Sequence, residues 1–376
     1  MRNKKKILRA VTSAQSLVFC RDVMVKMRAV GYDMVAVTSP GPELDSLRHD
    51  DGFHCVAVPM HRRISPVADL VSLVRLVIVM AKERPWVVHS MTPKAGLLCM
   101  IAAWLTGVPV RVHTFTGLVW PTATGLKRRL LMMTDRITCA CATHVIPEGK
   151  GVMHDLQHGG ITSKPMRVLG HGNVKGVDIE RFDPSRLGAQ AASGAFTFLF
   201  VGRIVGEKGI NELVEAFARL HEEQPATRLV LVGNYETELD PLSQGTRRII
   251  DAMDAIETPG PKRGDDLVSA YAEADCFVMP SYREGFPNVV LEAGAMGLPS
   301  VVTDINGSRE IVENGKNGLV VPPRDAVALY DAMKLMATDN EARLRMAREA
   351  RPMIVSRFER DYVQRCQIEF YKDVMG

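Results

Sequence analysis

The amino-acid sequence predicts an α/β protein made of two doubly wound, Rossmann-like domains, each built on a parallel sheet. Short apolar runs of strand length alternate with longer helical patterns along most of the chain, which is typical of βα units and of a parallel sheet. The length of 376 residues points to two domains rather than one, because a single domain usually holds about 100–200 residues.

The first domain is predicted over residues 1–170. Gly31 and Gly107 fall where two of its helices should end, since glycine commonly follows the last turn of a helix. Its predicted strands are residues 5–11, 34–38, 53–59, 86–90, 109–114 and 143–147.

A linker and a second domain follow. The alternation gives way to a Gly-, Pro- and Ser-containing stretch, so we place a linker at residues 171–195 and the second domain at residues 196–355. The C-terminal helix, residues 356–376, is expected to pack back on the first domain. The predicted strands of the second domain are residues 196–201, 228–233, 276–280, 299–303 and 318–321.

The composition excludes several classes of protein. With 46% hydrophobic and 24% charged residues, the chain is neither disordered nor fibrous. The net charge of +4 agrees with an anionic substrate or an acidic membrane surface. No apolar stretch reaches the roughly 20 residues of a membrane span, and the N-terminus does not resemble a signal peptide. We therefore expect a cytoplasmic protein whose cysteines are buried thiols: Cys20, Cys55, Cys99, Cys139, Cys141, Cys276 and Cys366.

The loop that follows the strand at residues 196–201 has the features of an anion site. Its glycines allow close approach of the backbone, and a helix begins directly after Gly209. Arg203 and Lys208 add two positive charges. Ligands bind beyond the carboxyl ends of strands in open α/β sheets, and helix N-termini favour anions. A diphosphate fits this loop.

A second chemical segment, residues 280–292, follows another predicted strand. Pro287 suits the first turn of a helix, which leaves backbone amides around residues 285–289 to face a ligand. Glu284 precedes this helix and Glu292 lies inside it. Because carboxylates are repelled by phosphate, the two glutamates are expected to hold hydroxyl groups of a sugar and a ribose that flank a diphosphate.

Three segments together resemble retaining glycosyltransferases of family 4, which have the GT-B fold with a donor site in the cleft between two Rossmann-like domains. These are the run from Glu284 to Glu292, the loop from Gly202 to Gly209, and the run from Gly176 to Pro184. The resemblance covers most of the second domain and, more weakly, the first.

The resemblance implies a role for each site residue. Glu284 would contact hydroxyls of the donor sugar and act in catalysis, and Glu292 would bind the ribose of the nucleoside. Arg203 and Lys208 would neutralise the diphosphate and stabilise the leaving group, and both are therefore also catalytic candidates.

The backbone amides of Gly285 and Phe286 would help to bind the donor. Cationic side chains and helix dipoles can replace Mg²⁺, so neither a metal nor a cofactor is expected. His154 and His158 have helical spacing, but the motif lacks the glutamate of H-E-x-x-H. We therefore do not expect zinc there.

Two histidines of the first domain compete for one role. His113 ends a predicted strand and resembles the family histidine near the reactive carbon of the donor sugar. His89 ends the preceding strand and could take the same place. Either residue could also only satisfy backbone groups in a loop, and the sequence leaves these alternatives open.

The resemblance also suggests an acceptor. Residues 89–94 and 116–118 resemble bacterial enzymes that build capsule, O-antigen or other lipid-linked glycans, which extend a polyprenyl-diphosphate-linked sugar at the inner membrane face. We expect a hexosyl- or N-acetylhexosaminyl-transferase, with UDP favoured over GDP and no nucleic acid partner. The basic run 127–129 beside the apolar run 130–133 suggests peripheral contact with anionic lipid.

Two other functions remain possible on the sequence. A nucleotide-sugar epimerase of similar fold would act on the donor without an acceptor. A non-catalytic sugar-nucleotide-binding or assembly protein would keep the fold without turnover, although retention of all four donor-site residues argues against it. Dependence of donor consumption on an added acceptor would separate these functions from a transferase.

Overall fold

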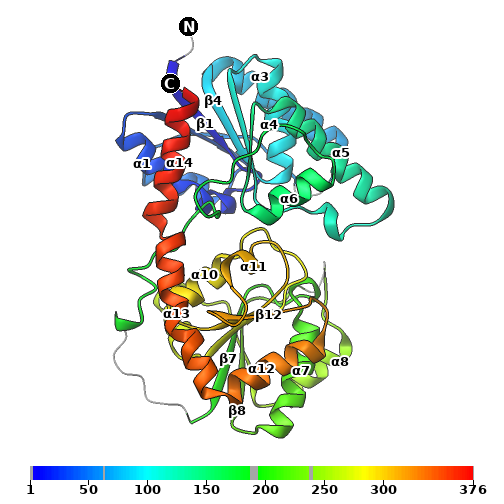
Figure 1. Ribbon diagram of the computed structural model, residues 1–376. Helices are drawn as coiled ribbons and strands as arrows, with labels where there is room; N and C mark the ends of the chain where they lie inside the picture. Colours follow the sequence, from blue (N-terminus) through cyan, green and yellow to red (C-terminus); the bar gives the residue numbers. More distant parts are fainter. Residues whose placement is uncertain (1–2, 62–63, 187–193, 237–239, 376) are drawn as a thin grey trace. The chain divides into compact units, whose positions relative to one another are not determined.

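The computed structural model describes residues 3–61, 64–186, 194–236 and 240–375 of the chain. These residues form two compact units (Figure 1). Unit 1 comprises residues 1–175 together with 361–376, and unit 2 comprises residues 176–360. Each unit holds a six-stranded sheet in which all the paired strands run parallel.

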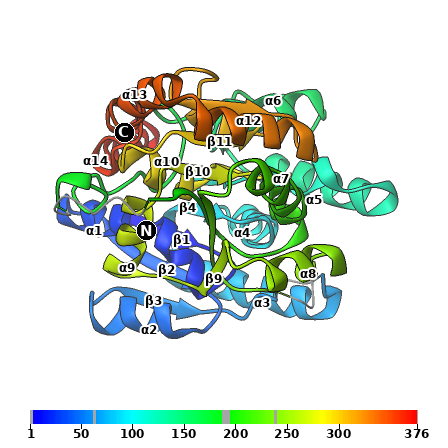
Figure 2. The ribbon, with the colours of Figure 1, turned by 90° about the horizontal axis from the view of Figure 1, so that it is seen from below.

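Unit 1 has the strand order β3-β2-β1-β4-β5-β6. The edge strand β3 lies beside β2, with α2 next to it (Figure 2). The strands are β1 Asn3–Ala10, β2 Asp33–Thr38, β3 His54–Ala57, β4 Pro85–Met91, β5 Val110–Phe115 and β6 His144–Pro147. The helices are η1 Ala14–Phe19, α1 Arg21–Ala29, α2 Pro42–His49, α3 Pro66–Glu83, α4 Pro93–Leu105, η2 Trp120–Thr122, α5 Gly125–Cys141, α6 Lys150–His158 and α14 Arg360–Met375.

The sheet of unit 1 is buried on both faces. Along β1, Leu8 and Ala10 join one core cluster, whereas Ile7 joins another, because successive side chains of a strand point to opposite faces. The first cluster includes residues of α3, α4 and α5, and the second includes residues of α1, α2 and α14. Burial on both faces explains why the central strands appear in the sequence as continuous apolar runs.

Helix α14 belongs almost wholly to unit 1, although it ends the chain. Its Gln367 donates a hydrogen bond to the Val174 carbonyl (2.7 Å), and its Asp361 pairs with Lys26 (2.7 Å). Helix α13 precedes it in unit 2. The chain passes between the units where Val177 donates to the Phe358 carbonyl (2.9 Å) and accepts from the Arg360 amide (2.9 Å). The two crossing segments therefore run side by side.

Unit 2 repeats the architecture with the strand order β12-β11-β10-β7-β8-β9. Its strands are β7 Phe196–Val201, β8 Thr227–Val232, β9 Ile256–Gly260, β10 Cys276–Met279, β11 Ser300–Thr303 and β12 Gly318–Val321. Its helices are η3 Pro184–Arg186, η4 Gly206–Lys208, α7 Ile210–Glu223, α8 Gln244–Ala252, α9 Gly264–Ala272, α10 Asn288–Ala295, α11 Ser308–Ile311, α12 Ala326–Thr338 and α13 Asn340–Phe358.

The fold class predicted from the sequence is confirmed, and the predicted strands correspond to eleven of the strands observed. The prediction omitted β9. Only Ile256 of this edge strand is buried, and its sequence, Ile-Glu-Thr-Pro-Gly, contains no apolar run. Proline is tolerated there because an edge strand leaves one row of amides unpaired.

Two further predictions from the sequence concern the cysteines and the membrane-spanning segments. All seven cysteines are free thiols, as expected, but only Cys20, Cys99, Cys139 and Cys276 are buried, whereas the other three are partly exposed. Within the part of the chain that the structure describes, every helix is too short or too polar to cross a membrane.

Candidate functional site

The loop after β7 lies against the loop after β10, and a glycine makes this contact possible. Gly209 has a left-handed backbone (φ 71°), and a Cβ atom there would lie only 2.1 Å from the Pro280 carbonyl oxygen. In addition, the Tyr282 amide donates to the Glu207 carbonyl (2.9 Å). Because β7 and β10 are neighbours in the sheet, the two sequence motifs meet at its carboxyl edge.

Lys208 and Glu284 come together in this loop pair. The Lys208 ammonium donates to a Glu284 carboxylate oxygen, and both side chains are mostly buried. The sequence assigned these residues to the diphosphate and to the sugar, respectively. Their direct ion pair was not anticipated, because it depends on the packing of two loops 76 residues apart.

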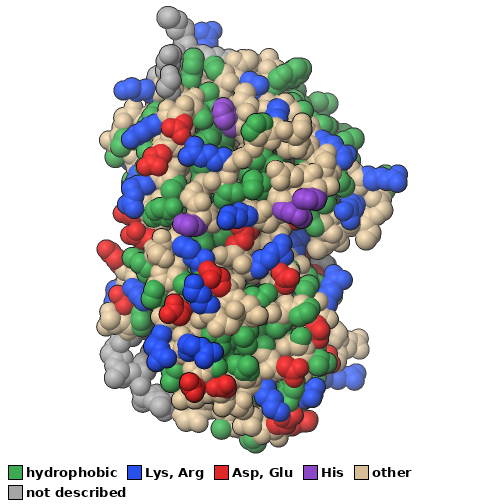
Figure 3. All heavy atoms as spheres, in the orientation of Figure 1, with side chains coloured by type: hydrophobic (Ala, Val, Ile, Leu, Met, Phe, Trp, Pro, Cys, Tyr) green, Lys and Arg blue, Asp and Glu red, His purple; other side chains and the backbone are tan. Residues whose placement is uncertain are grey.

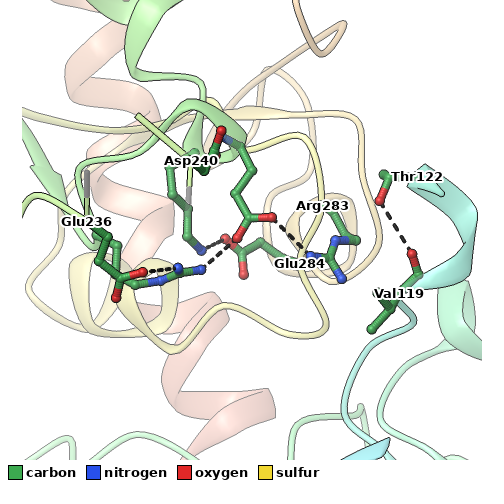
Figure 4. Close-up of polar contacts among 9 residues, drawn as sticks. Val119, Thr122, Glu236, Asp240, Arg283 and Glu284 are labelled. Atoms are coloured by element: carbon green, nitrogen blue, oxygen red, sulfur yellow. Dashed lines mark hydrogen bonds and ion pairs between the residues drawn. The ribbon is translucent and has the colours of Figure 1, made fainter. Parts of the chain in front are cut away.

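Arg203 is held by two carboxylates. Its guanidinium donates to Glu207 (2.6 Å) and to Glu236 (2.8 Å), and Glu207 also accepts from Arg283 at 3.0 Å (Figure 4). Partial burial favours the protonated form of Glu207, but the guanidinium groups of Arg283 and Arg203 outweigh it and lower the pKa of that carboxyl. Glu207 is therefore anionic, and it occupies the space between two arginines.

The backbone at residues 285 and 286 is fixed from two sides. A Cβ atom on Gly307 would lie 2.3 Å from the Gly285 carbonyl oxygen, so the loop after β11 approaches as closely as only glycine permits. The buried Phe286 ring packs on Phe358, with 5.3 Å between ring centroids. Pro287 stands at the N-cap of α10, one position before the first turn in which the sequence placed it.

Glu292 is oriented by a buried tyrosine that the sequence analysis missed. The Tyr271 hydroxyl donates to the Glu292 carboxylate at 3.0 Å. Burial, together with the nearby Glu292 charge, raises the pKa of Tyr271 well above its ordinary value, so the phenol remains a donor. Tyr271 lies on α9, and only the tertiary fold brings α9 against α10 at this point.

His113 of unit 1 lines a cavity of about 20 Å³, which is room for about one water molecule. Its Nδ1 lies 2.9 Å from the Ser90 hydroxyl oxygen. Burial lowers the pKa of His113 to about 3, so the imidazole is neutral at physiological pH.

Asp135 and Trp120 line the same cavity. Burial raises the pKa of Asp135 to about 7, even though the nearby indole N–H of Trp120 opposes the shift. Among the described residues, that N–H has no partner in hydrogen-bond geometry. The cavity therefore combines a neutral imidazole, an indole donor and a carboxyl group that titrates near neutral pH.

His89 lies in a different environment. Its Nδ1 is 2.7 Å from the Arg9 guanidinium and 2.6 Å from the Tyr371 hydroxyl, and its Nε2 is 2.7 Å from the Thr114 hydroxyl. Burial and the Arg9 charge lower the pKa of His89 well below its usual range. Both ring nitrogens are thus engaged by the protein.

Arg9 was not among the residues predicted from the sequence, although a single arginine inside an apolar strand is unusual. It is fully buried, and Tyr371 of α14 accepts from it at 2.6 Å. Elsewhere in unit 1, the exposed His154 and His158 rings stack at 3.8 Å. The described residues contain no group of three or more His, Cys, Asp or Glu side chains placed to share a metal ion.

Two family models match the chain. That of the glycosyl transferase 4-like domain matches residues 17–172, and that of glycosyl transferases group 1 matches residues 186–353. The capsular polysaccharide biosynthesis glycosyltransferase CapM of Staphylococcus aureus is 31% identical over 370 residues, which cover 95% of this chain and 94% of CapM. A UDP-Gal:alpha-D-GlcNAc-diphosphoundecaprenol alpha-1,3-galactosyltransferase of Escherichia coli is 30% identical over 334 residues, or 85% of this chain and 83% of that enzyme.

Solved structures share the fold. HepE of Anabaena in complex with UDP and glucose has a TM-score of 0.80 at 17% identity, over 98% of this chain and 100% of that chain. Sucrose-phosphate synthase from Thermosynechococcus elongatus has a TM-score of 0.81 at 20% identity, over 98% and 99% of the two chains. At these identities the likeness establishes the architecture.

Proposed function

Because this chain belongs to the GT-B glycosyltransferases that pair a 4-like domain with a group 1 domain, we propose that it transfers a hexosyl or N-acetylhexosaminyl group from a UDP-sugar to a lipid-linked glycan. The reaction retains the configuration of the donor carbon and serves the biosynthesis of capsule or another lipid-linked glycan. The observation that carries the proposal is the meeting of Arg203, Lys208 and Glu284 at the carboxyl edge of one sheet, with Glu292 held by a buried hydroxyl.

Each donor-site side chain has a task in this reaction. Arg203 and Lys208 neutralise the charge that develops on the diphosphate as it leaves, which stabilises the transition state more than the ground state. Glu284 accepts from hydroxyls of the sugar, and Glu292 accepts from the ribose hydroxyls. The backbone amides of residues 285 and 286 add donors to the diphosphate. These groups supply the required positive charge without a metal ion.

We assign His113, rather than His89, the place beside the reactive carbon of the donor. His113 lines a cavity and is neutral, so it can accept or share a hydrogen bond with a sugar hydroxyl. His89 already uses both ring nitrogens within the protein. Its role is to help hold Arg9 and α14 in place.

Donor consumption tests the proposal. The purified protein is incubated with UDP- and GDP-sugars, with and without a polyprenyl-diphosphate-linked sugar, and with EDTA in parallel. A transferase releases UDP only when both substrates are present, and EDTA leaves the rate unchanged. Conversion of the donor without an acceptor would instead identify an epimerase. Binding of a UDP-sugar with no turnover under any condition would indicate a non-catalytic protein.

We also propose that unit 1 attaches to an anionic membrane through α3 rather than through the run at residues 130–133. The sequence favoured that run, but Leu131 and Met132 pack against the core, and only Met133 of the run is exposed. Large aliphatic side chains are exposed instead along α3, and they follow one stripe of helical spacing: Val67, Leu70, Val71, Val74 and Ile78.

The charge around α3 fits an anionic partner. Arg75 and Lys82 are exposed on the helix, whereas its acids are neutralised within the protein, Asp69 by Lys94 (2.6 Å) and Glu83 by Lys6 (3.1 Å). Over the face of the molecule that Figure 3 shows, hydrophobic, basic and acidic side chains lie interspersed. Apolar side chains with flanking cations are the features of an interfacial helix.

Flotation with lipid vesicles tests the attachment. The double variant Val74→Asp/Ile78→Asp should lose binding to phosphatidylglycerol vesicles, while the wild type should bind these better than phosphatidylcholine vesicles. Val327→Asp, an exposed valine on α12 of unit 2, is the matched control and should bind as the wild type does. Equal flotation of the α3 double variant and the wild type would refute this surface.

A further inference from the structure

Glu207 bridges two arginines from different loops. Its two carboxylate oxygens accept separately, one from Arg203 (2.6 Å) and the other from Arg283 (3.0 Å). Arg283 lies directly before Glu284 in the loop after β10, with its guanidinium turned toward this cluster (Figure 4). Two guanidinium groups thus converge on one small oxyanion at the edge of the sheet where a donor diphosphate would bind.

The arrangement of this bridge is that of an oxyanion site. Guanidinium groups recognise carboxylate and phosphate with the same planar fork of N–H donors. A phosphate group therefore fits where the Glu207 carboxylate now lies. All three side chains are partly exposed, at 45% for Arg203, 36% for Glu207 and 29% for Arg283. Ion pairs this accessible are weak and can be exchanged for those of a ligand.

The backbone would hold the loops that carry Arg203 and Arg283 in place after such an exchange. The Tyr282 amide donates to the Glu207 carbonyl (2.9 Å), which ties the loop carrying Arg283 to the loop carrying Arg203. The Glu207 amide donates in turn to the Asp240 carboxylate (2.5 Å). Only the Glu207 side chain needs to rotate for the site to open, while its main chain stays fixed.

We propose that Arg203 and Arg283 form a two-armed clamp for one phosphate of the donor, and that the Glu207 carboxylate occupies this clamp until the donor displaces it. The inference rests on the proposed function and adds Arg283 as a third cation beside Arg203 and Lys208. It also makes Glu207 an internal competitor of the donor, so that the free chain binds phosphate groups less tightly than its cations alone would allow.

The two residues should therefore change ligand affinity in opposite directions. Glu207→Gln removes the competing charge, and the affinity for UDP should rise about fivefold, which corresponds to the loss of two exposed ion pairs that together contribute about 1 kcal/mol. Arg283→Gln removes one arm, and the affinity should fall about tenfold. Inorganic diphosphate should follow the same order. Uridine carries no phosphate and should bind all variants alike.

Isothermal titration calorimetry on the full chain tests the clamp, with UDP, inorganic diphosphate and uridine as the probes. Glu257→Gln is the matched control. It removes the carboxylate that pairs with Arg228 (3.2 Å) between β8 and β9, and it should leave all three affinities unchanged. Arg283→Lys keeps the charge without the fork and should fall between the wild type and Arg283→Gln. Melting temperatures identify any variant that has lost its fold.

The outcomes separate this inference from the proposed function. If UDP binds the wild type but Glu207→Gln and Arg283→Gln leave its affinity unchanged, the clamp is refuted and the proposed donor site stands. If UDP does not bind but inorganic diphosphate binds with the expected order of variants, the clamp stands and the proposed donor is wrong. If the wild type binds neither probe, both proposals fail.

Discussion

Asp135 places a carboxyl group that titrates near neutral pH inside the His113 cavity, and its replacement by asparagine should stabilise unit 1 in a pH-dependent manner. Burial raises the pKa of Asp135 from 3.8 to about 7. The folded chain therefore holds this proton more tightly than the unfolded chain does. Stability contributed by the protonated form is present below pH 4 and is lost as the pH rises from about 4 to 7.

The magnitude follows from the two pKa values. The difference of about 3 corresponds to about 4 kcal/mol at 1.36 kcal/mol for each pKa unit. Because part of Asp135 remains accessible to water, solvent screens part of this penalty, and we expect about 2 kcal/mol. Asp135→Asn should thus raise the free energy of unfolding by about 2 kcal/mol at pH 8 and by almost nothing at pH 4.

Urea unfolding followed by tryptophan fluorescence measures this effect in unit 1 alone, because all three tryptophans lie there: Trp86, Trp104 and Trp120. Asp50→Asn, at an exposed position after α2, is the matched control and should show no pH-dependent gain. A gain for Asp135→Asn that is the same at pH 4 and pH 8, or no gain at pH 8, would contradict the argument from burial.

Three further substitutions probe the two units. Lys208→Ala should lower kcat by about 10²–10³ in a UDP-release assay, as the loss of an electrostatic contact to a leaving group does, with little change in melting temperature; full activity would remove Lys208 from the mechanism. Glu292→Gln keeps an acceptor for Tyr271 but loses the charge. Calorimetry should therefore show weaker binding of both UDP and uridine, and an unchanged affinity for uridine would exclude a ribose contact. Tyr371→Phe removes a hydrogen-bond acceptor of the buried Arg9 and should destabilise unit 1 by about 1–3 kcal/mol in urea unfolding. If the variant were as stable as the wild type, Arg9 would not depend on α14.

Local patterns were sufficient to predict most of the fold. A parallel strand covered on both faces appears as an apolar run whatever its neighbours are, as residues 196–201 and 276–279 illustrate. Strand β9 was missed because only Ile256 of this edge strand is buried, so its sequence contains no apolar run. The C-terminal helix was expected to pack back on the first domain, but the contacts that hold residues 361–376 in unit 1, such as that of Gln367 with Val174, join residues far apart in the sequence and are seen only in the fold.

In the candidate site, too, some residues were predictable from the sequence and others were not. Arg203, Lys208, Glu284 and Glu292 were identified because each stands at a fixed place after a strand or inside the following helix. Their partners were missed because they come from other elements. Tyr271 reaches Glu292 from α9, and no spacing rule connects α9 to α10. Asp135 on α5 appeared as an ordinary charge in a helix, and only burial in the folded unit gives it an unusual pKa.

The donor site of the free chain is close to electrically neutral, and this neutrality limits what can happen when a ligand binds. Arg203, Lys208 and Arg283 face carboxylates of Glu207, Glu236 and Glu284 in the four ion pairs described above. A nucleoside diphosphate would bring about two further negative charges into this cluster. Binding is therefore favourable only if carboxylates leave the cations or turn to sugar hydroxyls. Glu284 can do the latter, whereas Glu207, which lies between two arginines, has to move away.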